Sequence, residues 1–151
     1  MNLKKIKLKY DKFKQYLILI RLNKPIGIFL LLWPTLWGLW IASEGFPNTN
    51  ILIVFLFGVF LMRSAGCILN DIIDKDFDKF VARTQNRPLA SDKLSSIEAF
   101  IVAISLIFIA FLLVLTTNTL TVQLSFVAVI LAGAYPFLKR HTYLPQFFLG
   151  L

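Results

Sequence analysis

The sequence predicts an all-α protein, a polytopic bundle of transmembrane helices. Three observations lead to this fold class: 58% of the 151 residues are hydrophobic, only 16% are charged, and the apolar residues gather in long runs. Soluble domains contain about 45–50% apolar and about 25% charged residues. The single cysteine excludes a disulfide framework. Because a small soluble core cannot bury this much apolar surface, we expect a lipid bilayer to surround the protein.

Four apolar runs predict about four complete membrane spans. Each run has 17 to 19 residues, and a helix of that length measures roughly 26–29 Å, enough to cross the hydrocarbon core of a bilayer. A further apolar run begins at Phe147 and stops at Leu151, which predicts the start of a fifth span. The four complete runs comprise residues 26–42, 51–69, 97–115 and 120–138.

The basic residues are distributed asymmetrically about these runs. Fifteen of the sixteen lysines and arginines precede the first run, lie between the second and third, or follow the fourth. The connections after the first and third runs contain none. Since lysine and arginine accumulate on the cytoplasmic side of membrane proteins, we expect residues 1–24 and the loop 70–96 to be cytoplasmic. Basic segments that alternate with spans also argue against a nucleic-acid partner.

The second run ends in a cluster of acidic residues. On a helical wheel at about 100° per residue, one arc roughly 100° wide holds several polar side chains if the helix continues through this stretch. The members of this arc are Arg63, Cys67, Asn70, Asp71, Asp74 and Asp78. Carboxylates crowded in this way repel one another unless a cation lies between them. Mg²⁺ prefers such oxygen ligands and usually takes one or two carboxylates together with phosphates.

Arginines accompany the acidic residues. Arg83 and Arg87 follow them in the sequence, and guanidinium groups match phosphate oxygens bidentately. Arg63 lies within the second run, where a charge costs about 2.5–3.5 kcal/mol on insertion scales and usually marks a cavity or functional site. Carboxylates and arginines at a membrane surface therefore indicate a metal-bridged diphosphate. The alternative is a solvated loop in which the acidic residues pair with Lys75, Lys79 and Arg83.

The two motifs resemble the signature NDxxDxxxD…RTxxRPL of the UbiA-type membrane prenyltransferases. The matching segments are NDIIDKDFD at residues 70–78 and VARTQNRPL at residues 81–89. Residues 21–37, RLNKPIGIFLLLWPTLW, and residues 134–146, with AYPFLKR and LPQ, resemble the branch of this family that acts on 4-hydroxybenzoate. The resemblance covers nearly all of residues 21–151.

The resemblance implies both a fold and a reaction. Members of the family have nine spans and nearly twice this length, so residues 1–151 would form the N-terminal half of one transmembrane prenyltransferase domain. A second aspartate motif belongs to the other half, and no second acidic cluster follows Glu98 here. The implied reaction transfers a polyprenyl group from polyprenyl diphosphate to the ring of 4-hydroxybenzoate in ubiquinone biosynthesis, at the bacterial inner membrane. We expect this chain to need the other half for catalysis.

The resemblance also assigns roles to residues. Three carboxylates would hold Mg²⁺ on the diphosphate and act in catalysis: Asp71, Asp74 and Asp78. Residues expected to bind the substrates are Asn70, Arg63, Arg83, Arg87, Lys139 and Arg140.

Two other functions remain open from the sequence. A prenyltransferase for protohaem or for another quinone precursor would share the aspartate and arginine motifs, although the KPIG and WP patterns in the first run favour the 4-hydroxybenzoate branch. A small transporter or channel subunit would use Arg63 and the aspartates to line an ion path. That function requires polar faces on several spans, and the third and fourth runs are almost entirely apolar.

Overall fold

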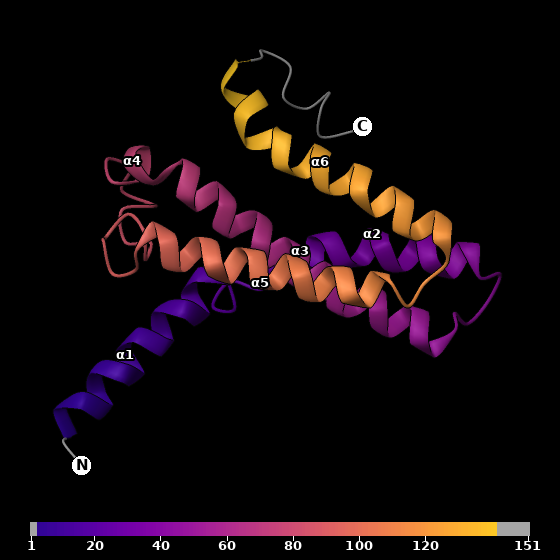
Figure 1. Cartoon of the computed structure of the whole chain (residues 1–151), viewed down its shortest axis with the longest axis horizontal. Helices are drawn as coiled ribbons and strands as arrows, with labels where there is room; N and C mark the ends of the chain where they lie inside the picture. The colour runs from indigo at the N-terminus through magenta and orange to yellow at the C-terminus, as the bar shows by residue number, and fades with distance from the viewer. Residues whose placement is uncertain (1–2, 142–151) are drawn as a thin grey trace.

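The computed structural model of the chain describes residues 3–141, and the side chains of residues 9–134. Throughout this range the regular structure is helical, as Figure 1 shows. The helices are α1 (Leu3–Leu19), α2 (Ile26–Ala42), α3 (Thr49–Ile73), α4 (Lys75–Asp78), α5 (Ser96–Val114) and α6 (Thr119–His141). The predicted all-α class is therefore confirmed.

The four predicted runs correspond to α2, α3, α5 and α6. Two of these helices, α3 and α5, are long and apolar enough to cross a membrane. The apolar part of α2 spans Ile26–Ala42 and that of α6 spans Thr119–Ala134, and both are shorter. The total of four spans stays a prediction, and the fifth run at 147–151 lies outside the described residues.

Side-chain caps mark where the helices begin. The Ser95 hydroxyl accepts a hydrogen bond from the Glu98 backbone N–H at 3.1 Å, and the Glu98 carboxylate accepts one from the Ser95 N–H at 3.0 Å. This reciprocal pair is a capping box, which satisfies two backbone donors at the start of α5. Asn48 caps α3 through Asn50 at 2.9 Å. These polar caps fix the points at which α3 and α5 start.

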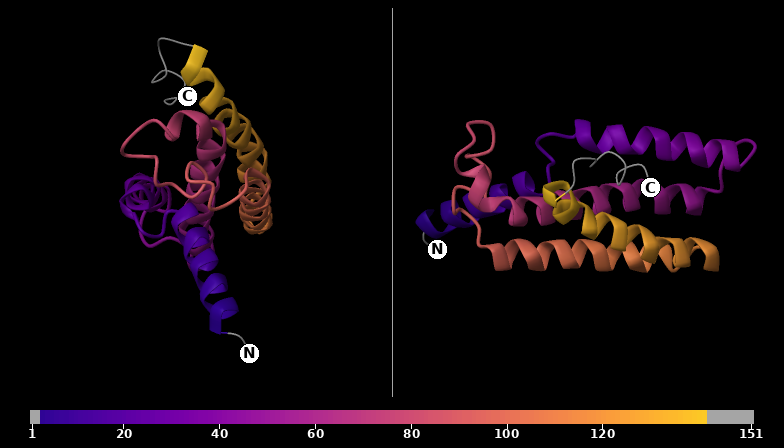
Figure 2. Two further views of the ribbon diagram at one scale, coloured as in Figure 1. Left: turned by 90° about the vertical axis from the view of Figure 1, so that its left-hand side faces the viewer. Right: turned by 90° about the horizontal axis from the view of Figure 1, so that it is seen from above.

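The bundle places its short and long connections at opposite ends. In Figures 1 and 2, α2, α3 and α5 lie side by side, with α6 crossing them and diverging. The short connections 43–48 and 115–118 lie at one end, and α4 and the loop 79–95 lie at the other.

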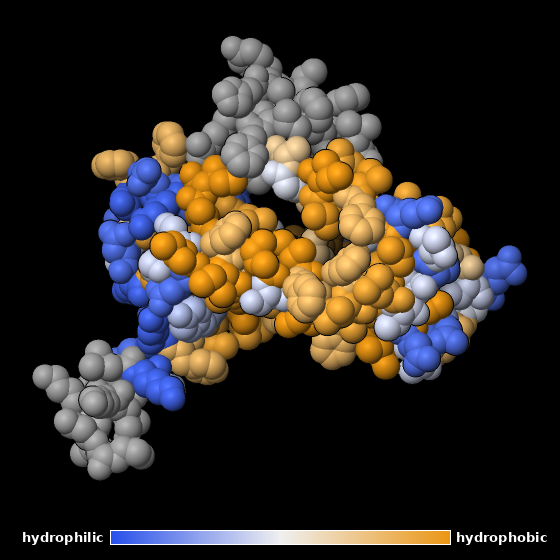
Figure 3. All heavy atoms as spheres, in the orientation of Figure 1, coloured by the Kyte–Doolittle hydropathy of each residue, from blue (hydrophilic) through white to orange (hydrophobic). Residues whose placement is uncertain are grey.

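Figure 3 shows an apolar middle between polar ends. Only 33% of the apolar window of α3 and 17% of that of α5 are buried, which is the surface expected of helices in lipid.

Small residues bring α3 and α5 together. Ser64 and Ala65 of α3 are buried, as are Ala99, Ala103 and Ala110 of α5. Side chains of this size let helix backbones approach closely, which is how membrane helices gain van der Waals contact. Near the polar end the interface widens into an apolar core of six residues: Leu19, Ile68, Leu89, Leu94, Ala99 and Ala103. Through Leu19, Leu89 and Leu94, the end of α1 and the long loop pack against the α3–α5 pair.

The N-terminal helix contacts the start of α5. α1 slopes away from the bundle at its polar end (Figure 1). The Lys12 ammonium donates to Glu98 Oε1, and the Tyr16 hydroxyl donates to the same oxygen at 3.3 Å. The hydrogen bond to Glu98 raises the pKa of Lys12. Glu98 therefore caps α5 and also holds α1.

Overpacking the α3–α5 interface should destabilise the bundle. We expect Ala103→Leu to lower the free energy of unfolding by about 1–3 kcal/mol, because the added carbons have no space between the helices. Thermal unfolding in detergent measures the change, and Ile104→Leu is the control because Ile104 is exposed on the same helix. Equal melting temperatures for the two variants would contradict the described interface.

Candidate functional site

A buried carboxylate lies at the centre of the polar end of the bundle. Asp71, in the last turn of α3, is only 2% exposed. Arg21 Nη2 donates to both of its carboxylate oxygens, at 2.6 Å to Oδ1 and 2.7 Å to Oδ2. Arg87 Nη1 donates to Oδ1 at 3.1 Å. Since an unpaired buried charge is very costly, these two guanidinium groups supply the positive charge that a buried carboxylate needs.

Arg87 joins Asp71 to a second acidic residue. The same nitrogen, Nη1, donates to Asp78 Oδ2 at 2.6 Å, and Asp78 is also buried. Two carboxylates that would otherwise repel each other therefore share one cationic group. The structure thus brings together three of the predicted site residues, Asp71, Asp78 and Arg87. The Arg87 guanidinium is the positive group that lies between the two carboxylates. We call these three residues and Arg21 the carboxylate–arginine cluster.

Asp74 lies at a break between two helices. α3 ends at Ile73, Asp74 is its C-cap with φ −88° and ψ 2°, and α4 follows as a separate short helix. The helical wheel assumed an unbroken helix to Asp78, and that assumption is wrong, because the helix is divided at Asp74. Asp71 and Asp78 nevertheless both contact Arg87. The Asn70 amide donates to Asp74 Oδ2 at 2.9 Å. Asn70 and Asp74 thus form a pair next to the cluster.

The loop after α4 is folded in a way that fixes Arg87. The buried Thr84 hydroxyl donates to the Asp78 carbonyl at 3.1 Å, and the Arg87 N–H donates to the Thr84 carbonyl at 2.9 Å. The Ser91 hydroxyl donates to the Arg87 carbonyl at 2.8 Å. Leu89 anchors this segment in the core. The RTxxRPL segment therefore holds its second arginine against the acidic residues through backbone contacts.

An ion pair ties the loop to α4. Lys75 Nζ lies 2.9 Å from Asp92 Oδ1, and this hydrogen bond lowers the pKa of the Asp92 carboxyl. Asp76 is 89% exposed and pairs with Lys79 at 3.5 Å. These surface contacts are the kind expected of a solvated loop, in contrast to the buried contacts of Asp71 and Asp78.

Arg21 was not among the residues predicted for the site. It lies between α1 and α2 with a left-handed backbone, φ 64°. The neighbouring Ile20 carbonyl accepts a hydrogen bond from the Ser64 hydroxyl at 3.1 Å. Spacing gives no sign of a contact 50 residues away. One sequence signal could have indicated Arg21: the segment that resembles the 4-hydroxybenzoate branch, residues 21–37, begins at this arginine.

Of the other predicted basic residues, the structure describes the side chains of Arg63 and Arg83. Arg63 donates from Nε to the Gly27 carbonyl at 3.3 Å and from Nη1 to Cys67 Sγ at 2.8 Å, so it links α2 to α3. Arg83 is exposed in the loop. Lys139 and Arg140 are in α6, but their side chains lie outside the described residues.

The donor set can be compared with what a metal requires. Within the part of the chain that the structure describes, no group of three or more His, Cys, Asp or Glu side chains is placed to hold a metal ion. The two carboxylates that share Arg87 Nη1 match the one or two that Mg²⁺ takes alongside substrate phosphates. Asp71 and Asp78 therefore fit a cation shared with a diphosphate, whereas the predicted three-carboxylate set is not assembled.

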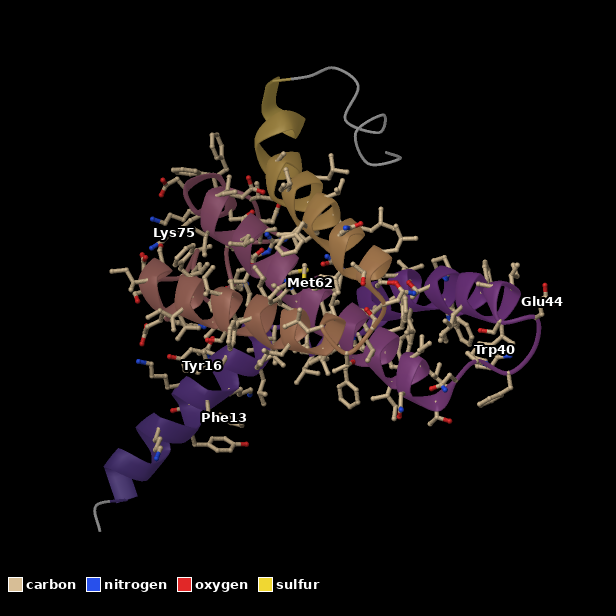
Figure 4. All side chains as sticks on the ribbon, turned by 45° about the vertical axis from the view of Figure 1, so that its right-hand side comes forward. Phe13, Tyr16, Trp40, Glu44, Met62 and Lys75 are labelled. Atoms are coloured by element: carbon tan, nitrogen blue, oxygen red, sulfur yellow. The ribbon has the colours of Figure 1, made fainter. Side chains whose placement is uncertain are left out.

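An apolar hollow of about 610 Å³ lies on α2. It is lined by Leu30, Trp33, Pro34 and Trp37. Figure 4 shows Trp40, further along α2, at the opposite end of the bundle from Lys75. All four lining residues are exposed and belong to α2, so the hollow is an open part of the surface of that helix.

Comparison with known proteins agrees with this site. The model of the UbiA prenyltransferase family matches residues 31–151, which include both motifs. The chain belongs to the UbiA prenyltransferase family. UbiA prenyltransferases generally depend on a divalent metal.

Several UbiA relatives are similar along most of the chain. A 4-hydroxybenzoate octaprenyltransferase from Psychromonas ingrahamii is 59% identical over 141 residues, which are 93% of this chain and 49% of the relative. Proteins of the same name from Vibrio campbellii and Marinomonas sp. are 56% and 53% identical, and the chain covers 50% of each. The chain thus spans about half the length of these relatives. No solved structure is significantly similar to it.

The contact between Gly27 and Arg63 can be tested by adding a methyl group. A Cβ at Gly27 would lie 2.9 Å from Arg63 Nη2, whereas one at Gly38 meets nothing within 4 Å. Gly→Ala in a helix normally stabilises by about 0.8–1 kcal/mol. We expect that gain for Gly38→Ala but a smaller gain or a loss for Gly27→Ala, as measured by thermal unfolding. In an Arg63→Met background both substitutions should stabilise equally, and a persisting difference would exclude Arg63 as the cause.

Proposed function

We propose that this chain takes part in transferring a polyprenyl group from polyprenyl diphosphate to the ring of 4-hydroxybenzoate, a step of ubiquinone biosynthesis. The observation that carries the proposal is the carboxylate–arginine cluster, in which Asp71 and Asp78 share Arg87 Nη1 at the end of a membrane-length helix. Acidic and basic groups in contact can hold a metal and the anion it bridges. The names of the relatives supply the substrates.

The acidic residues are proposed to hold Mg²⁺ against the diphosphate. Asp71 and Asp78 are the principal ligands, because both are buried and share one cation. Asp74 is assigned to the same ion on the sequence motif, and Asn70, which hydrogen-bonds to Asp74, is assigned to substrate binding. Mg²⁺ bound there supplies a Lewis acid that neutralises charge on the diphosphate oxygens.

The arginines are proposed to bind the anionic groups of the substrates. Arg87 can transfer its hydrogen bonds from Asp71 and Asp78 to a phosphate oxygen once another cation neutralises the carboxylates. Arg83, exposed in the same loop, offers a second guanidinium. The assignment of Lys139 and Arg140 to the diphosphate or the aromatic carboxylate rests on the sequence, as does that of Arg63.

The reaction then follows from charge stabilisation. When the allylic C–O bond breaks, its electron pair leaves with the diphosphate, and Arg87 and Arg83 stabilise the negative charge that develops there. The ring carbon ortho to the phenol attacks the allylic cation, and loss of the ring proton restores aromaticity. The apolar surface of the helices lets the isoprenoid tail remain in the bilayer.

The proposed location is the bacterial inner membrane, with the cluster at the cytoplasmic side. The support is the concentration of basic residues at the end of the bundle that carries α1, α4 and the loop 79–95. Lysine and arginine favour the cytoplasmic side. This orientation places Asp71 where a diphosphate substrate arrives from the cytosol.

Substitution of the central carboxylate tests the proposed function. Membranes containing the chain, alone or co-expressed with the C-terminal half of the Psychromonas ingrahamii relative, receive Mg²⁺, labelled 4-hydroxybenzoate and polyprenyl diphosphate. We expect product only when both halves are present, because the relatives are twice as long. Asp71→Asn should lower the rate at least about 100-fold, since charge stabilisation is lost. Asp76→Asn is the control, because Asp76 is exposed and outside the cluster.

Activity that survives Asp71→Asn would refute the metal assignment. Product with protohaem in place of 4-hydroxybenzoate would instead favour another branch of the family.

Replacing Arg87 by lysine should weaken the binding of only one of the two substrates. We expect Arg87→Lys to raise the KM for polyprenyl diphosphate about 10-fold, because an ammonium cannot replace the bidentate fork. The KM for 4-hydroxybenzoate should stay the same. Initial rates at varied concentrations of each substrate measure both constants, with Lys93→Ala as a control from the same loop. Equal increases in the two KM values would show that Arg87 supports the site as a whole.

A further inference from the structure

We propose that Arg21 is a positioning residue for the candidate site: it holds Asp71 in place and keeps its charge neutralised, so that Arg87 is free to exchange its carboxylate partners for the diphosphate. This inference rests on the proposed function, because it assumes that Asp71 binds the metal. It adds a residue from outside both sequence motifs and gives the two arginines around Asp71 different tasks.

The contacts of the two arginines differ in kind. Arg21 Nη2 reaches both oxygens of Asp71, at 2.6 and 2.7 Å, and so engages the whole carboxylate. Arg87 Nη1 contacts one oxygen of Asp71, at 3.1 Å, and lies closer to Asp78, at 2.6 Å. Of the two, Arg21 is therefore the stronger partner of Asp71. Arg87 can leave Asp71 while the ion pair with Arg21 persists.

The backbone holds Arg21 in a fixed place. Its left-handed φ of 64° is costly for any residue that has a Cβ. The surrounding contacts must therefore maintain this conformation. The Ser64 hydroxyl holds the Ile20 carbonyl at 3.1 Å, and Leu19 is completely buried in the core. The Arg21 carbonyl accepts a hydrogen bond from the Lys24 N–H at 3.0 Å. The turn between α1 and α2 is therefore anchored, and it holds the Arg21 guanidinium beside Asp71.

Electrostatics explains why this contact matters for binding. If Arg21 is removed, Arg87 is the remaining guanidinium at a carboxylate that is almost entirely shielded from water. Its release toward a phosphate before the metal is bound would then leave Asp71 uncompensated, which is strongly unfavourable. Arg87 should therefore stay with the carboxylates, and both the metal and the diphosphate should bind more weakly. Binding of the aromatic acceptor should not change.

The test uses the full chain co-expressed with the C-terminal half of the Psychromonas ingrahamii relative. The variants are Arg21→Gln, which removes the charge, Arg21→Lys, which keeps it, and Lys14→Gln, which removes an exposed charge from α1. Electron paramagnetic resonance measures the binding of Mn²⁺ in the presence of inorganic pyrophosphate, without catalysis. Initial rates give the half-saturating Mg²⁺ concentration and both KM values, and thermal unfolding reports the stability of each variant.

We expect Arg21→Gln to weaken Mn²⁺–pyrophosphate binding about 10–100-fold, the effect typical of losing a group that orients a metal ligand. The KM for 4-hydroxybenzoate should be unchanged, Arg21→Lys should recover much of the binding, and Lys14→Gln should match the unsubstituted chain. If Arg21→Gln does not fold, Arg21→Lys alone decides, because Nη2 of the guanidinium reaches both Asp71 oxygens and an ammonium in its place should still weaken metal binding measurably.

Two results would overturn the inference. One is a lower melting temperature with unchanged Mn²⁺–pyrophosphate binding, which would make Arg21 purely structural. The other is an equal loss of affinity for both substrates. Failure of the proposed function is a separate outcome, recognised by Asp71→Asn binding Mn²⁺–pyrophosphate as well as the unsubstituted chain does.

Discussion

The buried charge of Asp71 is the constraint on which the polar end of the bundle depends. A carboxylate with 2% exposure cannot remain ionised without close cationic partners. Its partners come from 50 residues earlier and 16 residues later in the sequence, so the turn before α2, the end of α3 and the loop after α4 must converge. Such a pair adds little net stability, but losing one partner costs about 3–5 kcal/mol. The buried carboxylate of Asp71 therefore determines how these three segments are arranged around it.

The helices could be predicted because their signals are local. Run length and apolar content placed the beginnings and ends of α2, α3, α5 and α6 within a few residues of those observed. The break at Asp74 could not be predicted, since residues 70–78 contain neither proline nor glycine to mark a helix end. The wheel was therefore extended one turn too far. For the same reason Asp74 was grouped with Asp71 and Asp78, although its side chain pairs with Asn70.

The site could be predicted only where its residues are close in the sequence. Asp71, Asp78 and Arg87 were identified because acidic residues at helical spacing are followed by an arginine within one short segment. The contact of Arg21 spans 50 residues and depends on a left-handed turn, which no spacing rule reveals. The partners of Arg63 are a backbone carbonyl and a thiol, so its charge gave no indication of them. The roles of Lys139 and Arg140 stay predictions.

The contact of α1 with Glu98 has a consequence for biogenesis. Lys12 and Glu98 are separated by 86 residues, and at ~5–20 residues per second a ribosome needs roughly 4–17 s to synthesise that interval. Throughout this time the lysine-rich helix has been made but its acceptor has not. The contact between α1 and Glu98 can therefore form only after the chain has been synthesised through α2, α3 and the start of α5.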